Sequence, residues 1–155
     1  MNSKIVKIPG SRVEISPASW RDLNAARQLE KICFPQDGWP ILDMIGVLTF
    51  PQTVRYKATL DDNMVGFVAG EIRRIQSTAW IATISVHPDL RGEGLGSKLL
   101  KLCENEMGMP KIKLSVRVSN QKAIEMYRRN GYVDVGRWEN YYKGKEDALV
   151  MEKLM

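Results

Sequence analysis

The chain has 155 residues, of which 44% are hydrophobic and 26% are charged, an ordinary globular composition that argues against intrinsic disorder. No apolar run approaches the roughly 18 residues that a membrane-spanning helix needs. The N-terminus lacks the apolar stretch of a secretory signal, so we expect one soluble domain over 1–155, in the cytoplasm and not bound to membranes. The net charge of +5 suits either an anionic ligand or solubility alone.

Hydrophobic periodicity divides the chain into strands and helices. In chain order we predict a strand at 12–16, helices at 18–33 and 41–48, strands at 54–60, 64–70 and 79–86, a helix at 95–107, a strand at 112–118, a helix at 121–130, and strands at 132–142 and 148–154. Segments 54–60 and 64–70 form a hairpin, and the apolar segment 79–86 is expected to be buried on both faces. The order β-α-α-β-β-β-α-β-α-β-β predicts a mixed α/β domain built on one sheet.

The cysteines and the histidine bear on redox and metal chemistry. Cys33 and Cys103 form no CxxC pair and lie in apolar-periodic segments, so we expect buried free thiols rather than a disulfide. His87 has no cluster of acids or cysteines around it, so no metal site is expected. No nucleic-acid-binding motif is present, and the basic residues Lys111 and Lys113 are expected on a solvated strand face.

The segment that follows the apolar strand carries the clearest chemical signal. In Arg91-Gly92-Glu93-Gly94-Leu95-Gly96-Ser97, three glycines lie between a strand and a helix. Glycines let the backbone approach an anion closely, and the free N–H groups at a helix start bind it. The segment is neither a P-loop nor a complete dinucleotide fingerprint. We predict a pyrophosphate site here, with a tight turn that binds no ligand as the alternative.

This loop resembles the R/Q-x-x-G-x-G/A signature of the GNAT family of N-acetyltransferases. The segment 120–132 resembles a second block of that family, N-x-x-A-x-x-x-Y-x-x-x-G-F/Y, so the likeness covers 79–132. Segments 114–120, 140–142 and 146–151 are similar to L-E-V-R-x-S-N, N-Y-Y and E-D-A-x-x-M of the ribosomal-protein and archaeal protein N-terminal acetyltransferases. The resemblance implies a single GNAT-type domain that uses acetyl-CoA (acetyl coenzyme A).

The resemblance also implies a set of residues that bind coenzyme A. The backbone of Ile84, Ser85 and Val86 would lie along the pantetheine arm like an added strand. Asn120 would contact the pantetheine or the acetyl group. Backbone N–H groups of the glycine loop would hold the pyrophosphate, from Arg91, Gly92, Glu93, Gly94, Leu95, Gly96 and Ser97.

Further roles implied by the resemblance concern catalysis and the acceptor. Tyr127 would point its hydroxyl at the thioester sulfur and protonate the leaving thiolate, with core packing as the alternative role. Tyr141 and Tyr142 would shape a groove for an acceptor peptide. The loop at 34–40 would form the opposite wall of that groove, where Trp39 either lines the groove or caps the core.

One position departs from the family pattern. The glutamate of L-E-V-R serves as general base in the ribosomal-protein enzymes, and this chain has Ser115 there. Strand 79–86 offers no carboxylate, so we expect the amine to lose its proton to a water held by Ser115 or Thr83, or to Glu71 on the hairpin. A weak base favours an α-amine as acceptor, because its pKa of about 8 lies well below the value of about 10.4 for lysine.

These features together predict acetyl transfer from acetyl-CoA to a primary amine. We expect direct attack, with Ser115 and Tyr127 as the catalytic residues, because no activated cysteine or Ser–His pair is evident. A backbone N–H of the strand, that of Val86, would stabilise the charge on the thioester oxygen. The expected acceptor is a protein or peptide N-terminus, such as that of a ribosomal protein. A small amine (a polyamine or metabolite), a lysine side chain, or an acyl-CoA-binding module without turnover are the alternatives.

Overall fold

The computed structural model describes residues 6–8, 10–35 and 40–155. Its strands form one sheet in the order β1-β2-β3-β4-β5-β6-β8-β7. The strands are β1 (Val6–Lys7), β2 (Glu14–Pro17), β3 (Thr53–Leu60), β4 (Asn63–Arg73), β5 (Thr78–Val86), β6 (Lys111–Arg117), β7 (Val133–Tyr142) and β8 (Glu146–Leu154). The helices are α1 (Leu23–Cys33), α2 (Ile41–Thr49), α3 (Leu95–Met107) and α4 (Gln121–Arg129), with short 3-10 turns at η1 (Trp20–Asp22), η2 (Arg74–Gln76) and η3 (Pro88–Leu90). The predicted mixed α/β fold is confirmed, and the two-residue edge strand β1 is the one strand that periodicity did not predict.

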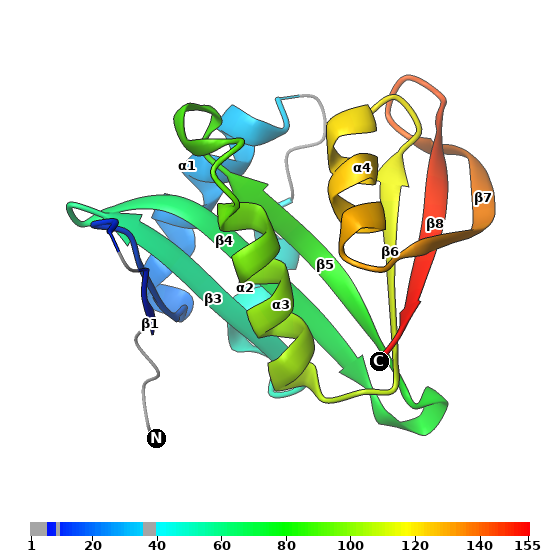
Figure 1. Cartoon of the computed structure of the whole chain (residues 1–155), viewed down its shortest axis with the longest axis horizontal. Coiled ribbons are helices and arrows are strands. Elements are labelled where there is room, and N and C mark those ends of the chain that lie inside the picture. Colours follow the sequence, from blue (N-terminus) through cyan, green and yellow to red (C-terminus); the bar gives the residue numbers. More distant parts are fainter. Residues whose placement is uncertain (1–5, 9, 36–39) are drawn as a thin grey trace.

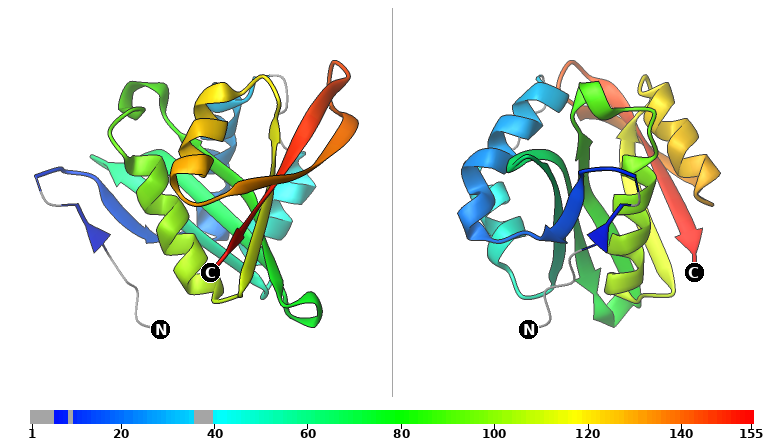
Figure 2. Two further views of the ribbon diagram at one scale, coloured as in Figure 1. Left: turned by 45° about the vertical axis from the view of Figure 1, so that its right-hand side comes forward. Right: turned by 60° about the vertical axis from the view of Figure 1, so that its left-hand side comes forward.

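Helices cover both faces of the sheet (Figure 1, Figure 2). On one face, α1 and α2 pack their apolar side chains against Phe67 and Ala69 of β4. On the other face, α3 and α4 pack against Val68 of β4, Ile81 of β5 and Leu114 of β6. Side chains alternate between the two faces of the sheet along a strand, so neighbouring residues of β4 belong to two separate layers of the hydrophobic core.

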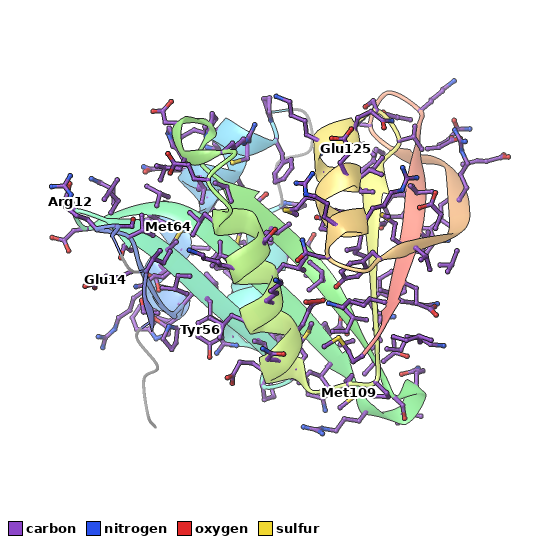
Figure 3. All side chains as sticks on the ribbon, viewed as in Figure 1. Arg12, Glu14, Tyr56, Met64, Met109 and Glu125 are labelled. Carbon is purple, nitrogen blue, oxygen red and sulfur yellow. The ribbon has the colours of Figure 1, made fainter. Side chains whose placement is uncertain are left out.

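Strands β5 and β6 define the opening that matters for function. They run parallel and pair only over Thr78–Trp80 with Lys111–Lys113. Beyond Trp80 the two strands diverge, as Figure 1 shows towards the top of the molecule. The narrow end of this wedge lies near Met109, in the turn between α3 and β6 (Figure 3). The wide end lies where β5 runs into η3 and the glycine loop.

A bulge in β5 changes which layer its side chains enter. Ala69 of β4 pairs with Thr83, and the next residue, Gly70, pairs with Ile81, so Ala82 is an extra residue. Before the bulge, Ile81 faces the α3 layer. After it, Thr83 faces α1, where its hydroxyl bonds to a carboxylate of that helix.

The expectation that 79–86 is buried on both faces is wrong. Trp80, Ala82, Ile84 and Val86 are only half-buried, because β5 has no partner strand on the β6 side beyond Trp80. Both cysteines are free thiols. Cys103 is fully buried as expected, whereas Cys33 is half-buried and donates its thiol hydrogen bond to the Val86 carbonyl at 3.4 Å. None of the helices in the described part of the chain is long and apolar enough to cross a membrane.

Candidate active site

The glycine loop at the wide end of the wedge has the backbone conformation of an anion site. Gly92 and Gly94 both have φ of +83°, and no heavy atom lies within 4 Å of the position that a Cβ would take on either residue. Gly94 caps α3, and its carbonyl accepts the N–H of Lys98 at 3.1 Å. The N–H groups of the first turn of α3 therefore have no partner within the helix and point toward the opening, where the helix dipole favours negative charge.

The third glycine of the loop has a packing role. A Cβ on Gly96 would lie 3.0 Å from the Sδ atom of Met126 on α4. Glycine here lets α3 and α4 approach closely, and the contact is reinforced by Asn130, whose Nδ2 donates to the Ser97 Oγ at 3.0 Å. The start of α3 is thereby fixed relative to the helix that carries Tyr127.

The Leu95 side chain points away from the opening, whereas the Arg91 side chain bonds to the edge of β5. Leu95 is buried in the core, and Glu93 is exposed, so the backbone is what these residues can offer to an anion. Arg91 Nε donates to the Val86 carbonyl at 3.0 Å, which ties the loop to the end of β5.

The free edge of β5 presents peptide groups to the opening. The His87 N–H donates to the Val65 carbonyl of β4 at 2.8 Å. Because peptide groups alternate in direction along a strand, those of Ile84 and Val86 face the β6 side instead. The Ser85 side chain faces α1. The Val86 carbonyl accepts the Cys33 thiol and Arg91 Nε, so this edge offers the Ile84 peptide group and the Val86 N–H to an extended ligand that pairs with it as a strand would.

Tyr127 of α4 and Ser115 of β6 lie on the side of the opening opposite β5. The Tyr127 side chain is 6% exposed and packs edge-on against Tyr132. Burial and, to a smaller extent, the nearby Tyr142 raise the pKa of Tyr127, so its hydroxyl keeps its proton. The Ser115 Oγ lies 3.2 Å from the Tyr142 hydroxyl. The fold thus brings these three predicted residues into one cluster.

Asn120 lies where β6 leads into α4 and acts as the N-cap of that helix. Its Oδ1 accepts the N–H of Ala123 at 3.3 Å, a bond that is typical of asparagine at an N-cap. The cap fixes the start of α4, the helix that carries Tyr127.

An aromatic wall extends from this cluster along the sheet. Trp80 stacks on Trp138 with 5.8 Å between ring centroids, and Trp138 contacts Tyr141 at 5.0 Å, which in turn contacts Tyr142 at 5.0 Å. Lys113 lies over the Trp80 ring, on the same sheet face. The sequence analysis predicted Tyr141 and Tyr142 as groove residues but did not predict Trp80. Trp80 directly precedes the buried Ile81, so alternation along the strand would have placed its side chain on the opposite face of β5. Trp39 lies outside the described residues.

A buried carboxylate lies beside β5, and the sequence analysis did not predict it. Glu30 of α1 is 2% exposed, and its Oε1 accepts hydrogen bonds from the Thr83 hydroxyl at 2.7 Å and the Ser85 hydroxyl at 2.9 Å. Its Oε2 is buried without a hydrogen-bond partner among the described residues. Burial raises the pKa of Glu30, and the two hydroxyls partly offset this effect. The spacing of Ala26, Glu30 and Cys33, at i, i+4 and i+7, would have placed this glutamate on the inner face.

Glu71, which the sequence offered as a base, is poorly placed. It is exposed and pairs with Arg73 at 3.4 Å. It also lies on β4 opposite Trp80, so β5 stands between its strand and the opening.

The comparisons with known proteins agree with this geometry. Residues 23–132 match the Acetyltransferase (GNAT) family. The chain belongs to this family.

This chain is similar to relatives in the family over most of their length. It is 34% identical to the [Ribosomal protein bS18]-alanine N-acetyltransferase of Salmonella typhimurium over 88% of this chain and 94% of that protein. It is 32% identical to an N-acetyltransferase of Methanocaldococcus jannaschii over 87% of each chain. The crystal structure of the corresponding ribosomal-protein-alanine enzyme from Escherichia coli superposes with a TM-score of 0.82 at 27% identity, covering 92% of this chain and 93% of that one.

The GNAT enzyme is an acetyl-CoA-dependent N-acetyltransferase. The described residues fit that cosubstrate. The glycine loop leaves its N–H groups open to a pyrophosphate, and the free edge of β5 leads from the loop toward Ser115 and Tyr127. A second strand along the whole of β5 would fill this opening, so the divergence of β5 and β6 is what makes the site.

Proposed function

We propose that this GNAT enzyme acetylates the N-terminal α-amine of a protein or peptide. The observation that carries the proposal is the aromatic wall of Trp80, Trp138, Tyr141 and Tyr142, which runs outward from the Ser115–Tyr142 contact. A wall of this length suits an extended chain better than a small molecule, since flat rings bind peptide bonds and side chains alike.

The charges along the wall are balanced. Arg73 and Lys113 both lie over the Trp80 ring, and Arg117 lies over the Tyr142 ring. Each of these cations is paired with a glutamate, namely Glu71, Glu152 and Glu146 in the same order. The wall therefore has no excess of negative charge with which to bind a polyamine, which carries several positive charges. The similarity to ribosomal-protein-alanine N-acetyltransferases supports a protein acceptor. A ribosomal protein is accordingly the first acceptor to test.

We assign the binding of acetyl-CoA to backbone groups. The loop from Arg91 to Ser97 is proposed to hold the pyrophosphate through N–H groups, and the edge of β5 at 84–86 to pair with the pantetheine arm. The Val86 N–H is proposed to stabilise the thioester oxygen, and Asn120 to contact the arm at the rim. The bound cosubstrate supplies the activated acetyl group.

Tyr127 is proposed to donate its proton to the departing thiolate. Replacement by phenylalanine should lower kcat about 100-fold while leaving acetyl-CoA binding intact. Tyr132→Phe is the matched control, because it removes the hydroxyl of the neighbouring ring, which donates to Glu104 instead. Equal losses in the two variants would contradict the assignment.

The acceptor class is tested by thiol release with two peptide pools. One pool has free α-amines and no lysine, and the other has blocked N-termini and free lysines. Turnover with the first pool alone is expected. Trp138→Ala should raise KM for these peptides, while Trp20→Ala, a 65% exposed tryptophan on η1, should not. Turnover with the lysine pool or a polyamine alone would overturn the proposal, and silence with all amines would indicate a binding module.

A further inference from the structure

The second hydrogen-bond cluster at the opening centres on Glu30. This side chain is held by two hydroxyls from β5, and no cation among the described residues is bonded to it. From its own helix it faces the Cys33 thiol, and Arg91 lies beyond that thiol. β4 and α2 present apolar side chains to α1, namely Phe67, Ala69, Met44 and Leu48. A carboxylate in this setting has a strong affinity for a proton.

Register places this cluster opposite the Ser115–Tyr142 contact. Lys113 of β6 pairs with Trp80 of β5, so two residues further along, Ser115 stands level with Ala82 and Thr83 across the opening. Leu114 and Val116 are buried with α3, so the alternating side chain of Ser115 faces the side of the sheet that carries α1. Thr83 also faces that side, since its hydroxyl bonds to Glu30. The two clusters therefore flank the opening at one level and from one face.

We propose that Glu30 is the proton acceptor for the acceptor amine, reached through the hydroxyl of Thr83. The inference rests on the acetyl-transfer site assigned above. It solves the problem that Ser115 raises, because a serine cannot serve as a base unaided. Among the described residues, the Glu30 Oε2 has no hydrogen-bond partner and no cation is bonded to the carboxylate. Both features suit a base, because a salt bridge would lower the pKa of the carboxylate and so weaken its affinity for a proton.

One proton leaves the acceptor amine before the attack, and a second leaves it afterwards. The acceptor ammonium gives one proton to the Thr83 Oγ1 as the Thr83 hydroxyl proton passes to the Glu30 Oε1, which leaves a neutral amine and a carboxylic acid. The amine nitrogen bonds to the acetyl carbon, and the bond from that carbon to sulfur breaks. The sulfur takes the Tyr127 proton, the nitrogen returns its second proton to Tyr127, and Glu30 releases its proton to water. The two clusters act as a base and an acid on either side of the reacting atoms.

The variant Glu30→Gln tests the proposal directly. We expect kcat with an α-amine peptide to fall about 100-fold at neutral pH, with KM for acetyl-CoA unchanged. In wild type, kcat should fall at low pH as Glu30 becomes protonated. This fall should be absent from the pH profile of Glu30→Gln. The matched control is Glu104→Gln, another buried helical carboxylate outside the site, which should stay within a few-fold of wild type.

Two further variants define the route and keep the test valid if Glu30→Gln folds poorly. Thr83→Val removes the relay hydroxyl and should lose activity to the same extent, whereas Thr83→Ser keeps the hydroxyl and should retain it. Activity of Thr83→Val close to that of wild type would overturn the relay.

An acceptor that needs no base separates proton transfer from structural damage. A peptide with an aminooxy terminus is already neutral at neutral pH, so the Glu30→Gln defect should largely vanish with it. Equal losses with both acceptors would assign Glu30 to structure and overturn the proposal. If wild type acetylates lysines or small amines instead, the proposed acceptor class fails, and the same series is run with the amine that is used, so the two failures are distinguishable.

Discussion

Glu30 and Glu104 are both buried carboxylates on helices, and they differ in what surrounds them. Glu104 of α3 accepts the Tyr132 hydroxyl at 2.9 Å and lies 3.1 Å from the Lys153 ammonium. Glu30 of α1 accepts two hydroxyls through one oxygen, and its other oxygen has no partner among the described residues. Buried charge is ordinarily paired, so Glu104 follows the general rule and Glu30 departs from it.

The difference separates a structural carboxylate from a functional one. Glu104 joins α3 to β8 and to the residue that precedes β7, on the face of the sheet that carries α3. Glu30 adjoins the strand that faces the opening. We therefore expect changes around Glu104 to affect the free energy of unfolding, and changes around Glu30 to affect catalysis.

The largest stability effect should come from Lys153→Met. Lys153 is the cation of Glu104, which is 1% exposed, and its removal leaves a buried charge without a counterion. We expect a loss of about 3 kcal/mol in the free energy of unfolding, measured with urea. The double variant Glu104→Leu, Lys153→Met should recover most of that loss. A loss that the double variant does not recover would mean that Lys153 acts through packing instead.

A smaller effect is expected for Tyr132→Phe. The hydroxyl donates to Glu104, so its removal deprives a buried carboxylate of one donor but leaves the lysine in place. The expected loss is about 1–2 kcal/mol in the same unfolding experiment. A loss larger than that of Lys153→Met would show that the hydroxyl, and not the cation, is the main partner of Glu104.

Glu30→Gln should change the pH dependence of stability. The folded protein raises the pKa of Glu30, so wild type is favoured below the unfolded-state value of about 4.3 and loses that contribution as pH rises through the folded value. The difference in unfolding free energy should therefore shift in favour of the variant from acidic to neutral pH and then level off. A difference that is constant with pH would show that Glu30 has the same proton affinity in both states.

Ser85→Ala should have the smallest effect. Ser85 donates to the same Glu30 oxygen as Thr83 but lies two residues further along β5. We expect a loss below about 1 kcal/mol in stability and a kcat close to that of wild type, since the relay through Thr83 remains. A loss of kcat as large as that of Thr83→Val would place the proton route through Ser85.

Local sequence signals were sufficient for much of the fold and for part of the site. The glycines of the loop, the alternation in the hairpin and the cap at Asn120 act over a few residues, so they can be predicted from the chain alone. The family resemblance singled out Ser115, Tyr127 and Tyr142 one by one. In the fold, Tyr142 lies next to Ser115 and close enough to Tyr127 to affect its pKa.

What could not be predicted depends on contacts between distant segments. Glu30 bonds to residues 53 and 55 positions away, and Trp80 stacks on Trp138, which lies three strands away in the sheet order. The half-burial of β5 follows from its divergence from β6, which no pattern within 79–86 reveals. Gly96 was interpreted as part of an anion loop, and its closest constraint is the thioether of Met126.

The extra residue at Ala82 has a consequence for how this strand can change. It shifts the side-chain alternation by half a period, so Ile81 and Ile84 both enter the α3 layer while Thr83 and Ser85 serve Glu30. Deleting Ala82 would therefore remove the bulge and leave the faces of the later residues unchanged, because Thr83 would follow Ile81 in regular alternation. A regular strand that kept Ala82 would exchange these faces, placing hydroxyls in the hydrophobic layer and isoleucine and valine against a carboxylate. For a lineage of such chains, the extra residue and the bulge that accommodates it are gained or lost together.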